Sequence, residues 1–69
     1  MDKDIILLVL EEDLETNKNR LTYIKRLIEE NLDNTDLMLQ YNYSRIKYQS
    51  QNKYIKSLIY FIKNELSKI

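Results

Sequence analysis

The chain has 69 residues, it lacks Cys, His, Gly and Pro, and its 11 basic residues balance its 11 acidic ones. The length allows one small domain, and the missing residue types exclude disulfides, thiolate or imidazole metal sites and a histidine proton shuttle. A core of this size gives little net stability, so oligomerisation or packing on a larger partner is the remaining way to stabilise the fold.

The absence of Gly and Pro predicts few, long secondary-structure elements. Those residues mark tight turns and occupy backbone conformations that other residues avoid, so a chain of several strands and hairpins needs some of them. Long helices joined by an Asn/Asp turn do not. We therefore expect an all-α fold in which residues 1–69 form a single helical-hairpin domain.

The first predicted helix spans about residues 2–31. Its apolar residues alternate in steps of three and four, which is typical of a helix with one buried stripe. Asn17 and Asn31 occupy the two places where this series would otherwise continue, and Asp2 or Asp4 can cap the start of the helix. The apolar members of this first seam are Leu7, Leu10, Leu14, Leu21, Ile24 and Ile28. An alternative is a break at Asn17-Lys18-Asn19, which would give three helices.

The turn is predicted at about residues 32–35, and a second helix at about 35–67. Asn and Asp tolerate left-handed backbone conformations and form local hydrogen bonds, which favours a turn at Leu32–Asp36. Asn34 or Thr35 can cap the second helix, with Asp36 in its first turn. The second seam again alternates in steps of three and four and consists of Met38, Tyr41, Arg45, Tyr48, Asn52, Ile55, Ile59, Ile62, Leu66 and Ile69.

A short connection makes the two helices antiparallel neighbours. Residues 1–15 carry a net charge of about −5 and residues 37–69 about +5, so this arrangement brings opposite charges together. We expect Glu11, Glu12 and Glu15 to lie near Lys53, Lys56 and Lys63. It also places Asn17 beside Ser50, Gln51 and Asn52, as a polar waist in the seam. This waist either fixes register and partner number as a buried layer or is exposed to solvent, and the sequence leaves both interpretations open.

The open end of the hairpin carries more apolar residues than two helices can bury against each other. Ile5–Leu10 and Tyr54–Ile62 are apolar most of the way round their helices, and such helices must be buried most of the way round. A dimer that forms a four-helix bundle, with coiled-coil-like packing, or docking on a larger complex would cover them. The expected interaction core is Leu7, Leu10, Leu14, Ile55, Leu58, Ile59 and Ile62. The expected partner contacts are Tyr54, Tyr60 and Phe61.

Catalysis finds no support, because the serines have no histidine base and there is no Gly-rich phosphate loop or nucleophile elbow. Glu11 and Glu15 share a helix face and could hold a hard cation, but solvated acids near a helix start are far commoner. We therefore predict no catalytic, cofactor or metal site. The expected function is a non-enzymatic protein–protein interaction module, as a homodimer or as a small subunit of a larger assembly.

Nucleic-acid binding is the alternative function. The second helix interleaves tyrosines with basic residues, which can stack on unpaired bases and neutralise phosphates. The possible contacts are Arg45, Lys47, Lys53, Lys56 and Lys63. The zero net charge instead favours lysines that form a solvated face.

No membrane-spanning or targeting segment is expected. The apolar run Ile5–Leu10 has only six residues and is flanked by acids, so it is too short to span a bilayer and lacks the basic start of a secretory signal. The default expectation is a soluble intracellular protein of the cytoplasm that does not associate with membranes.

Overall fold

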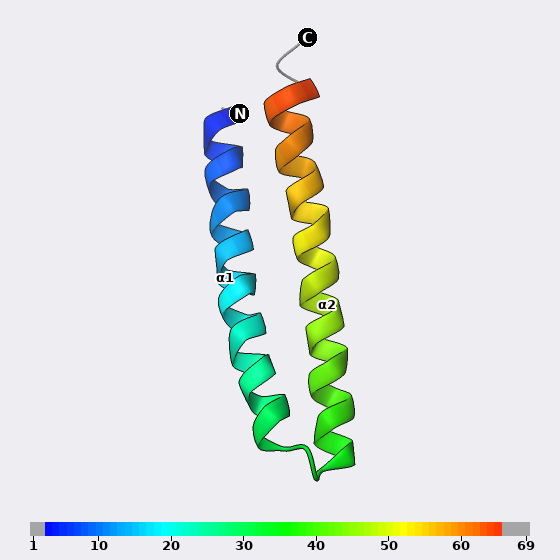
Figure 1. Ribbon diagram of the computed structural model, residues 1–69. Helices are drawn as coiled ribbons and strands as arrows, with labels where there is room; N and C mark the ends of the chain where they lie inside the picture. Colours follow the sequence, from blue (N-terminus) through cyan, green and yellow to red (C-terminus); the bar gives the residue numbers. More distant parts are fainter. Residues whose placement is uncertain (1–2, 66–69) are drawn as a thin grey trace.

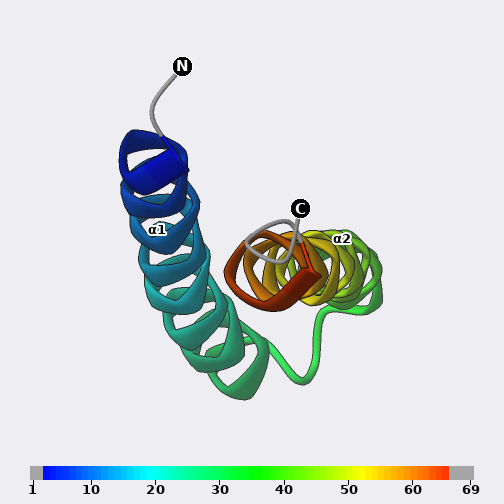
Figure 2. The same ribbon diagram turned by 90° about the horizontal axis from the view of Figure 1, so that it is seen from above.

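The computed structural model describes residues 3–65, which form a hairpin of two long helices (Figure 1). Helix α1 spans Lys3–Glu30, helix α2 spans Thr35–Tyr60, and a π-helical turn, η1, continues α2 over Phe61–Glu65. The all-α hairpin predicted from the sequence is confirmed, and no strand occurs in this part of the chain. The structure is elongated, measuring 53 × 15 × 15 Å, and α1 is inclined to α2 when viewed along the helices (Figure 2).

Helix α1 runs without a break through its polar centre. The alternative of a break at Asn17–Asn19 is wrong, because Asn17 is buried against α2 and its side chain is hydrogen-bonded there. A buried, bonded Asn does not compete with the helical backbone in the way that a free one does. Asp4 lies in the first turn, where a carboxylate suits the positive end of the helix dipole. The other capping candidate, Asp2, lies outside the described residues.

The turn between the helices closes without any left-handed residue. In the described part of the chain no residue has a positive φ, so the tolerance of Asn and Asp for that conformation is not used. Instead, Asn31 closes α1: its Nδ2 donates to the Leu27 carbonyl at 2.7 Å, and its backbone N–H donates to the Ile28 carbonyl at 3.2 Å. These bonds satisfy carbonyls that a helix end otherwise leaves unpaired.

Asn34 caps the start of α2, as predicted. Its backbone is extended, with φ −104° and ψ 98°, and its Oδ1 accepts a hydrogen bond from the Leu37 N–H at 3.1 Å. The first intrahelical bond runs from the Met38 N–H to the Asn34 carbonyl at 2.9 Å. Asp36 lies in the first turn. Of the two candidates, Asn34 therefore fills the cap and Thr35 is the first helical residue.

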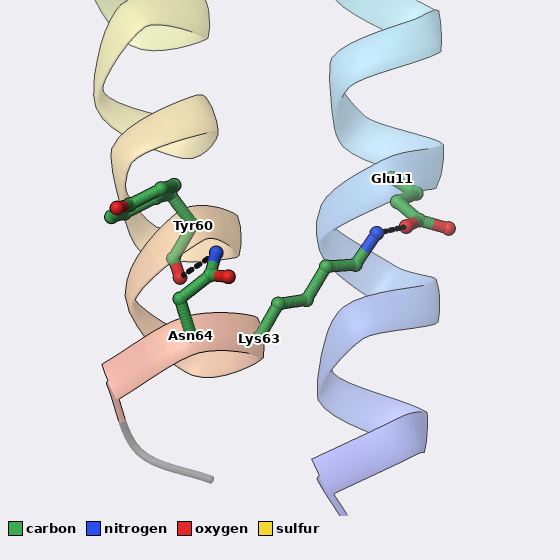
Figure 3. A network of polar contacts seen from close by, with 4 residues as sticks. All are labelled: Glu11, Tyr60, Lys63 and Asn64. Atoms are coloured by element: carbon green, nitrogen blue, oxygen red, sulfur yellow. Dashed lines mark hydrogen bonds and ion pairs between the residues drawn. The ribbon is translucent and has the colours of Figure 1, made fainter. Parts of the chain in front are cut away.

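The second helix differs from the prediction at its end. A regular α-helix was expected to about Ser67, but the α-helical part stops at Tyr60 and a π-helical turn follows. The Phe61 N–H is shared between the Leu58 and Ser57 carbonyls, and the Asn64 side chain donates to the Tyr60 carbonyl at 3.0 Å (Figure 3). A π-helical turn is wider than an α-helical one, because its backbone bonds run from residue i to residue i−5. The expected end of the helix at Ser67 lies outside the described residues.

The two predicted seams form the contact between the helices. Every seam position from Leu7 to Ile62 is buried or half-buried, which follows from the spacing of three and four residues on antiparallel helices. Leu66 and Ile69 lie outside the described residues. Only Ile24 and Ile62 are buried apolar residues in the part of the chain that the structure describes, at 7% and 9% exposure. The hairpin therefore has the predicted seam but only a small core.

Candidate interaction surface

The polar waist is buried between the helices. Asn17 is 5% exposed and Asn52 is 7% exposed, so the interpretation of a solvent-exposed waist is wrong for these two residues. The Asn17 Nδ2 donates to the Gln51 Oε1 at 3.4 Å, and the Arg20 Nη1 donates to the Asn17 Oδ1 at 3.4 Å. Gln51 lies across from Asn17, as the antiparallel register requires. Ser50 is exposed.

Two buried polar atoms in the seam have no hydrogen-bond partner within the described residues. They are the Oδ1 of Asn52 and the Nε of Arg45. A buried polar atom without a partner destabilises a fold by roughly 1–3 kcal/mol. The centre of the hairpin therefore contributes less stability than an apolar seam of the same length would.

Arg20 joins the waist to an aromatic ring. Its guanidinium lies 5.3 Å from the centre of the Tyr48 ring, and the Lys47 ammonium lies 5.8 Å from the same ring. Both distances suit a cation–π interaction, worth roughly 0.5–1 kcal/mol at exposed sites. Tyr48 itself is half-buried in the seam. The two cations therefore lie at the edge of the contact between the helices.

One predicted charge pair forms across the open end of the hairpin. The Lys63 Nζ lies 3.2 Å from the Glu11 Oε1 (Figure 3). Helical side chains lean toward the N-terminus of their own helix, so on antiparallel helices these two lean toward each other. About half of each side chain is exposed, and such a pair contributes roughly 0–1 kcal/mol. The remaining candidates for such pairs, Glu12, Glu15, Lys53 and Lys56, are exposed.

The hairpin leaves much of its apolar surface exposed. The described side chains of this kind that are 48–72% exposed are Ile5, Leu8, Val9, Tyr23, Leu32, Leu39, Tyr43, Ile46, Tyr54, Tyr60 and Phe61. They include the three expected partner contacts. The expected interaction core is half-buried at Leu7, Leu10, Leu14, Ile55, Leu58 and Ile59 and buried at Ile62. No described side chain of the hairpin is fully buried.

The total surface is larger than that of a compact monomer of this mass. The chain exposes 5518 Å², whereas a compact protein of 8.4 kDa exposes about 4600 Å². Its radius of gyration is 15.7 Å, against about 11 Å for a compact chain of 69 residues. The excess of about 900 Å² is close to the ~800 Å² that one partner contributes to a stable protein–protein interface.

The two flanks of the seam differ in character. Glu11 and Asp13 lie about 200° apart on α1, at 3.6 residues per turn, and so on opposite flanks. The Glu11 flank carries the ion pair to Lys63. The Asp13 flank is hollowed by two shallow grooves. The first, of about 350 Å³, is lined by Asp13, Thr16, Asn17, Arg20, Gln51, Tyr54 and Ile55. The second, of about 280 Å³, is lined by Arg20, Tyr23, Ile24, Leu27, Tyr41, Ser44 and Tyr48.

The five basic residues proposed for nucleic-acid contacts do not share one environment. Arg45 is half-buried in the seam, and Lys63 is paired with Glu11. Lys47 lies over the Tyr48 ring. Lys53 and Lys56 are exposed, and Tyr54 and Tyr60 beside them are 66% and 63% exposed. Exposed lysines therefore lie beside exposed aromatic rings around residues 53–60, and also at Lys47, one turn after Tyr43, which is 72% exposed.

The acidic side chains of residues 3–65 are spread along the two helices and the turn. This part of the chain holds no group of three or more acidic side chains arranged to bind a metal ion. A hollow of about 540 Å³ lies beside the turn and is lined by polar residues, from Glu30 to Asp36. Neither described α-helix combines the length and apolar character needed to cross a membrane.

No protein-family model, curated protein or solved structure matches the chain. The candidate surface is therefore defined by its own geometry. Asp13, Thr16, Arg20 and Tyr23, which line the grooves, belong to neither predicted seam and were not expected to form a site. The sequence feature that could have revealed these residues is a second stripe on α1, beside the first seam. Polar residues interrupt its apolar pattern.

Proposed function

We propose that this chain is a non-enzymatic protein–protein interaction module, which acts as a homodimer or as a small subunit of a larger assembly. The observation that carries the proposal is the exposed apolar surface of the hairpin. Ile24 and Ile62 are the only buried apolar side chains in the described residues, whereas large apolar residues on both helices are exposed. Contiguous exposed apolar surface on a small helical protein is typical of an interface.

The size of the surface supports the same proposal. A chain this short gains little net stability from its own core. The buried waist reduces that stability further, because Asn52 has a buried polar atom without a partner among the described residues. Burial of apolar surface stabilises a complex by roughly 25 cal/mol per Å². An interface that covers the excess surface of about 900 Å² would therefore supply stabilisation that the isolated hairpin lacks.

The test is a charge placed in the half-buried seam at the apolar end of the hairpin. Ile59 is half-buried on α2. We expect Ile59→Asp to leave the purified chain unfolded or monomeric, because a carboxylate in an apolar seam must either be desolvated or separate the surfaces that pack there. The matched control is Ser50→Asp, since Ser50 is exposed on the same helix. Circular dichroism and the mass in solution, measured on both variants, distinguish the two effects. An Ile59→Asp variant with unchanged melting and mass contradicts the proposal.

A second function, nucleic-acid binding, is favoured by one observation. Lys53 and Lys56 are exposed next to the exposed rings of Tyr54 and Tyr60, a combination that can neutralise phosphates and stack on unpaired bases. This function predicts binding to single-stranded RNA or DNA that weakens steeply with salt. The double variant Lys53→Gln, Lys56→Gln should bind the nucleic acid more weakly than the wild-type chain does. Lys25→Gln on α1 is the control and should bind as the wild-type chain does. No binding at low salt rules the function out.

A further inference from the structure

Helix α1 carries a second stripe with the same spacing as its seam. Counting from Ile6 in steps of three and four gives seven residues on the groove-bearing flank, here called the Thr16 stripe: Ile6, Val9, Asp13, Thr16, Arg20, Tyr23 and Leu27. Its two ends are apolar and its centre is polar. Val9 and Tyr23 are 50% and 59% exposed, whereas Ile6 and Leu27 are half-buried, so the hairpin covers this stripe only in part.

The stripe lies on one face of the hairpin together with residues of α2. Asp13, Thr16 and Arg20 line the first groove with Gln51 and Tyr54. Further toward the turn, the second groove is lined by stripe residues and by α2 residues that include Ser44. Arg20 lines both grooves, so they adjoin each other along this face.

The stripe is symmetric about Thr16. Asp13 lies three positions before Thr16 and Arg20 lies four positions after it. Val9 and Tyr23 lie seven positions away on either side. Ile6 and Leu27, at the two ends, lie ten and eleven positions away. Two copies of the stripe can therefore lie antiparallel, with the Thr16 residue of one copy beside the Thr16 residue of the other. In this arrangement apolar residues face apolar residues, and Asp13 of each copy faces Arg20 of the other.

We infer that the occupant of this face is a second copy of the same chain. The two copies pack α1 against α1 in antiparallel orientation, about a two-fold axis that passes beside Thr16. This inference rests on the proposed function, and it names the partner and the register. A two-fold interface uses the same patch on both copies, and the symmetry of the Thr16 stripe meets that requirement.

The charges select this orientation over the parallel one. In a parallel dimer, Asp13 would face Asp13 of the other copy and Arg20 would face Arg20, and like charges across an interface disfavour pairing. In the antiparallel dimer both contacts are attractive. The Asp13 carboxylate is also available for a partner, since it makes no hydrogen bond or ion pair with any side chain or main-chain group in the range 3–65.

The hairpin leaves enough surface uncovered for an interface of the size that a stable dimer needs. The excess surface of the hairpin, about 900 Å² relative to a compact chain, matches the contribution of each partner to a standard interface. In the antiparallel dimer the apolar open end of one copy, around Val9, covers the end near the turn of the other, around Tyr23 and Leu27. Each apolar end of the stripe is thereby covered by the opposite end of its partner.

Charge reversal on the full chain tests the register. Asp13→Arg and Arg20→Asp should each weaken the dimer at least about tenfold at low salt, because each turns two attractive contacts per dimer into two repulsive ones. The double variant restores both contacts and should return the dissociation constant to within about threefold of the original. The matched control is Glu29→Arg, which makes the same charge change at an exposed position about 140° round α1 from Thr16, and it should leave the dissociation constant unchanged.

Cross-linking gives a second measurement that does not depend on charge. The chain has no cysteine, so introduced thiols are unique. A mixture of Val9→Cys and Tyr23→Cys chains should form a mixed disulfide dimer under mild oxidation, whereas Val9→Cys alone should not. Circular dichroism of each variant verifies that it remains helical, which matters for Arg20→Asp because Arg20 also contacts Asn17 and Tyr48.

The outcomes separate this inference from the proposed function. Weakening by both single variants, rescue by the double variant and the mixed disulfide support the antiparallel dimer. A dimer insensitive to charge reversal, or a Val9→Cys chain that cross-links to itself, overturns the register and leaves the interaction module standing. If the purified wild-type chain is a poorly folded monomer, the antiparallel dimer is wrong, but the chain can still be an interaction module for another protein. A stably folded monomer overturns both.

Discussion

At the scale of single residues, the buried asparagines are the features that most limit the stability of the hairpin. Asn17 is bonded to Gln51 and Arg20, whereas the Oδ1 of Asn52 is buried without a partner in the described residues. Polar residues in a helical seam lower stability and can fix register and partner number. Asn17 and Gln51 meet across the seam, so the waist aligns the two helices.

Replacing Asn52 with Leu should raise the free energy of unfolding by about 1–3 kcal/mol, because it removes an unpaired buried polar atom from the seam. Chemical denaturation of the wild-type and variant chains measures the change. The control is Gln49→Leu, at an exposed position, which should change stability by no more than about 0.5 kcal/mol. A less stable Asn52→Leu chain would show that the waist makes bonds that the hairpin itself does not contain.

At the scale of elements, each helix is held at the turn by asparagine rather than by Gly or Pro. Asn31 closes α1 on the Leu27 carbonyl, and Asn34 opens α2 on the Leu37 N–H. The Asn34 N–H also donates to the Asn31 carbonyl at 3.0 Å, so a backbone bond closes the turn, and no described residue has a positive φ. A chain without Gly can therefore still reverse direction over the few residues between Glu30 and Thr35.

The cap at Asn34 should be measurable by itself. Asn34→Ala removes the acceptor for the Leu37 N–H and should lower the free energy of unfolding by about 1 kcal/mol, within a range of roughly 0.5–2. Asn34→Asp keeps the acceptor and should retain most of the stability. Thermal unfolding followed by circular dichroism compares the two variants. Equal losses in both would mean that the hydrogen bond at Asn34 is not what stabilises the start of α2.

The sequence was enough to predict the helices, the turn and both seams, and it narrowed the cap of α2 to Asn34 or Thr35. The spacing of residues such as Leu7, Leu10 and Leu14 is set by helix geometry, and a short connection allows only an antiparallel return. The π-helical turn at Phe61–Glu65 was missed, because it depends on competing backbone bonds that leave no periodic signal. The burial of the waist stayed undecided, because Asn at a seam position suits both a buried and a solvated layer.

The exposed residues of the two helices were likewise predictable only in part. Tyr54, Tyr60 and Phe61 were expected to contact a partner because helices apolar all round cannot be buried by one neighbour. Asp13 and Arg20 were overlooked, because charged residues on an outer stripe are usually solvated. Only the arrangement of both helices places them along one groove with Gln51.

At the scale of the whole molecule, the hairpin is elongated and thinly packed. It measures 53 × 15 × 15 Å, and only two of its described apolar side chains are buried. The charge pair between Glu11 and Lys63 at the open end is half-exposed and contributes little. Under the proposed function, the additional stability comes from surface that another molecule covers.

Self-association is decided by the mass of the purified chain in solution, measured by light scattering with circular dichroism on the same sample. We expect a strongly helical dimer near twice 8.4 kDa whose melting temperature rises with protein concentration. A poorly folded monomer would assign the apolar surface to a different protein. A strongly helical monomer that unfolds cooperatively, at a temperature independent of concentration, would show that the hairpin needs no partner and would contradict the proposed interaction module.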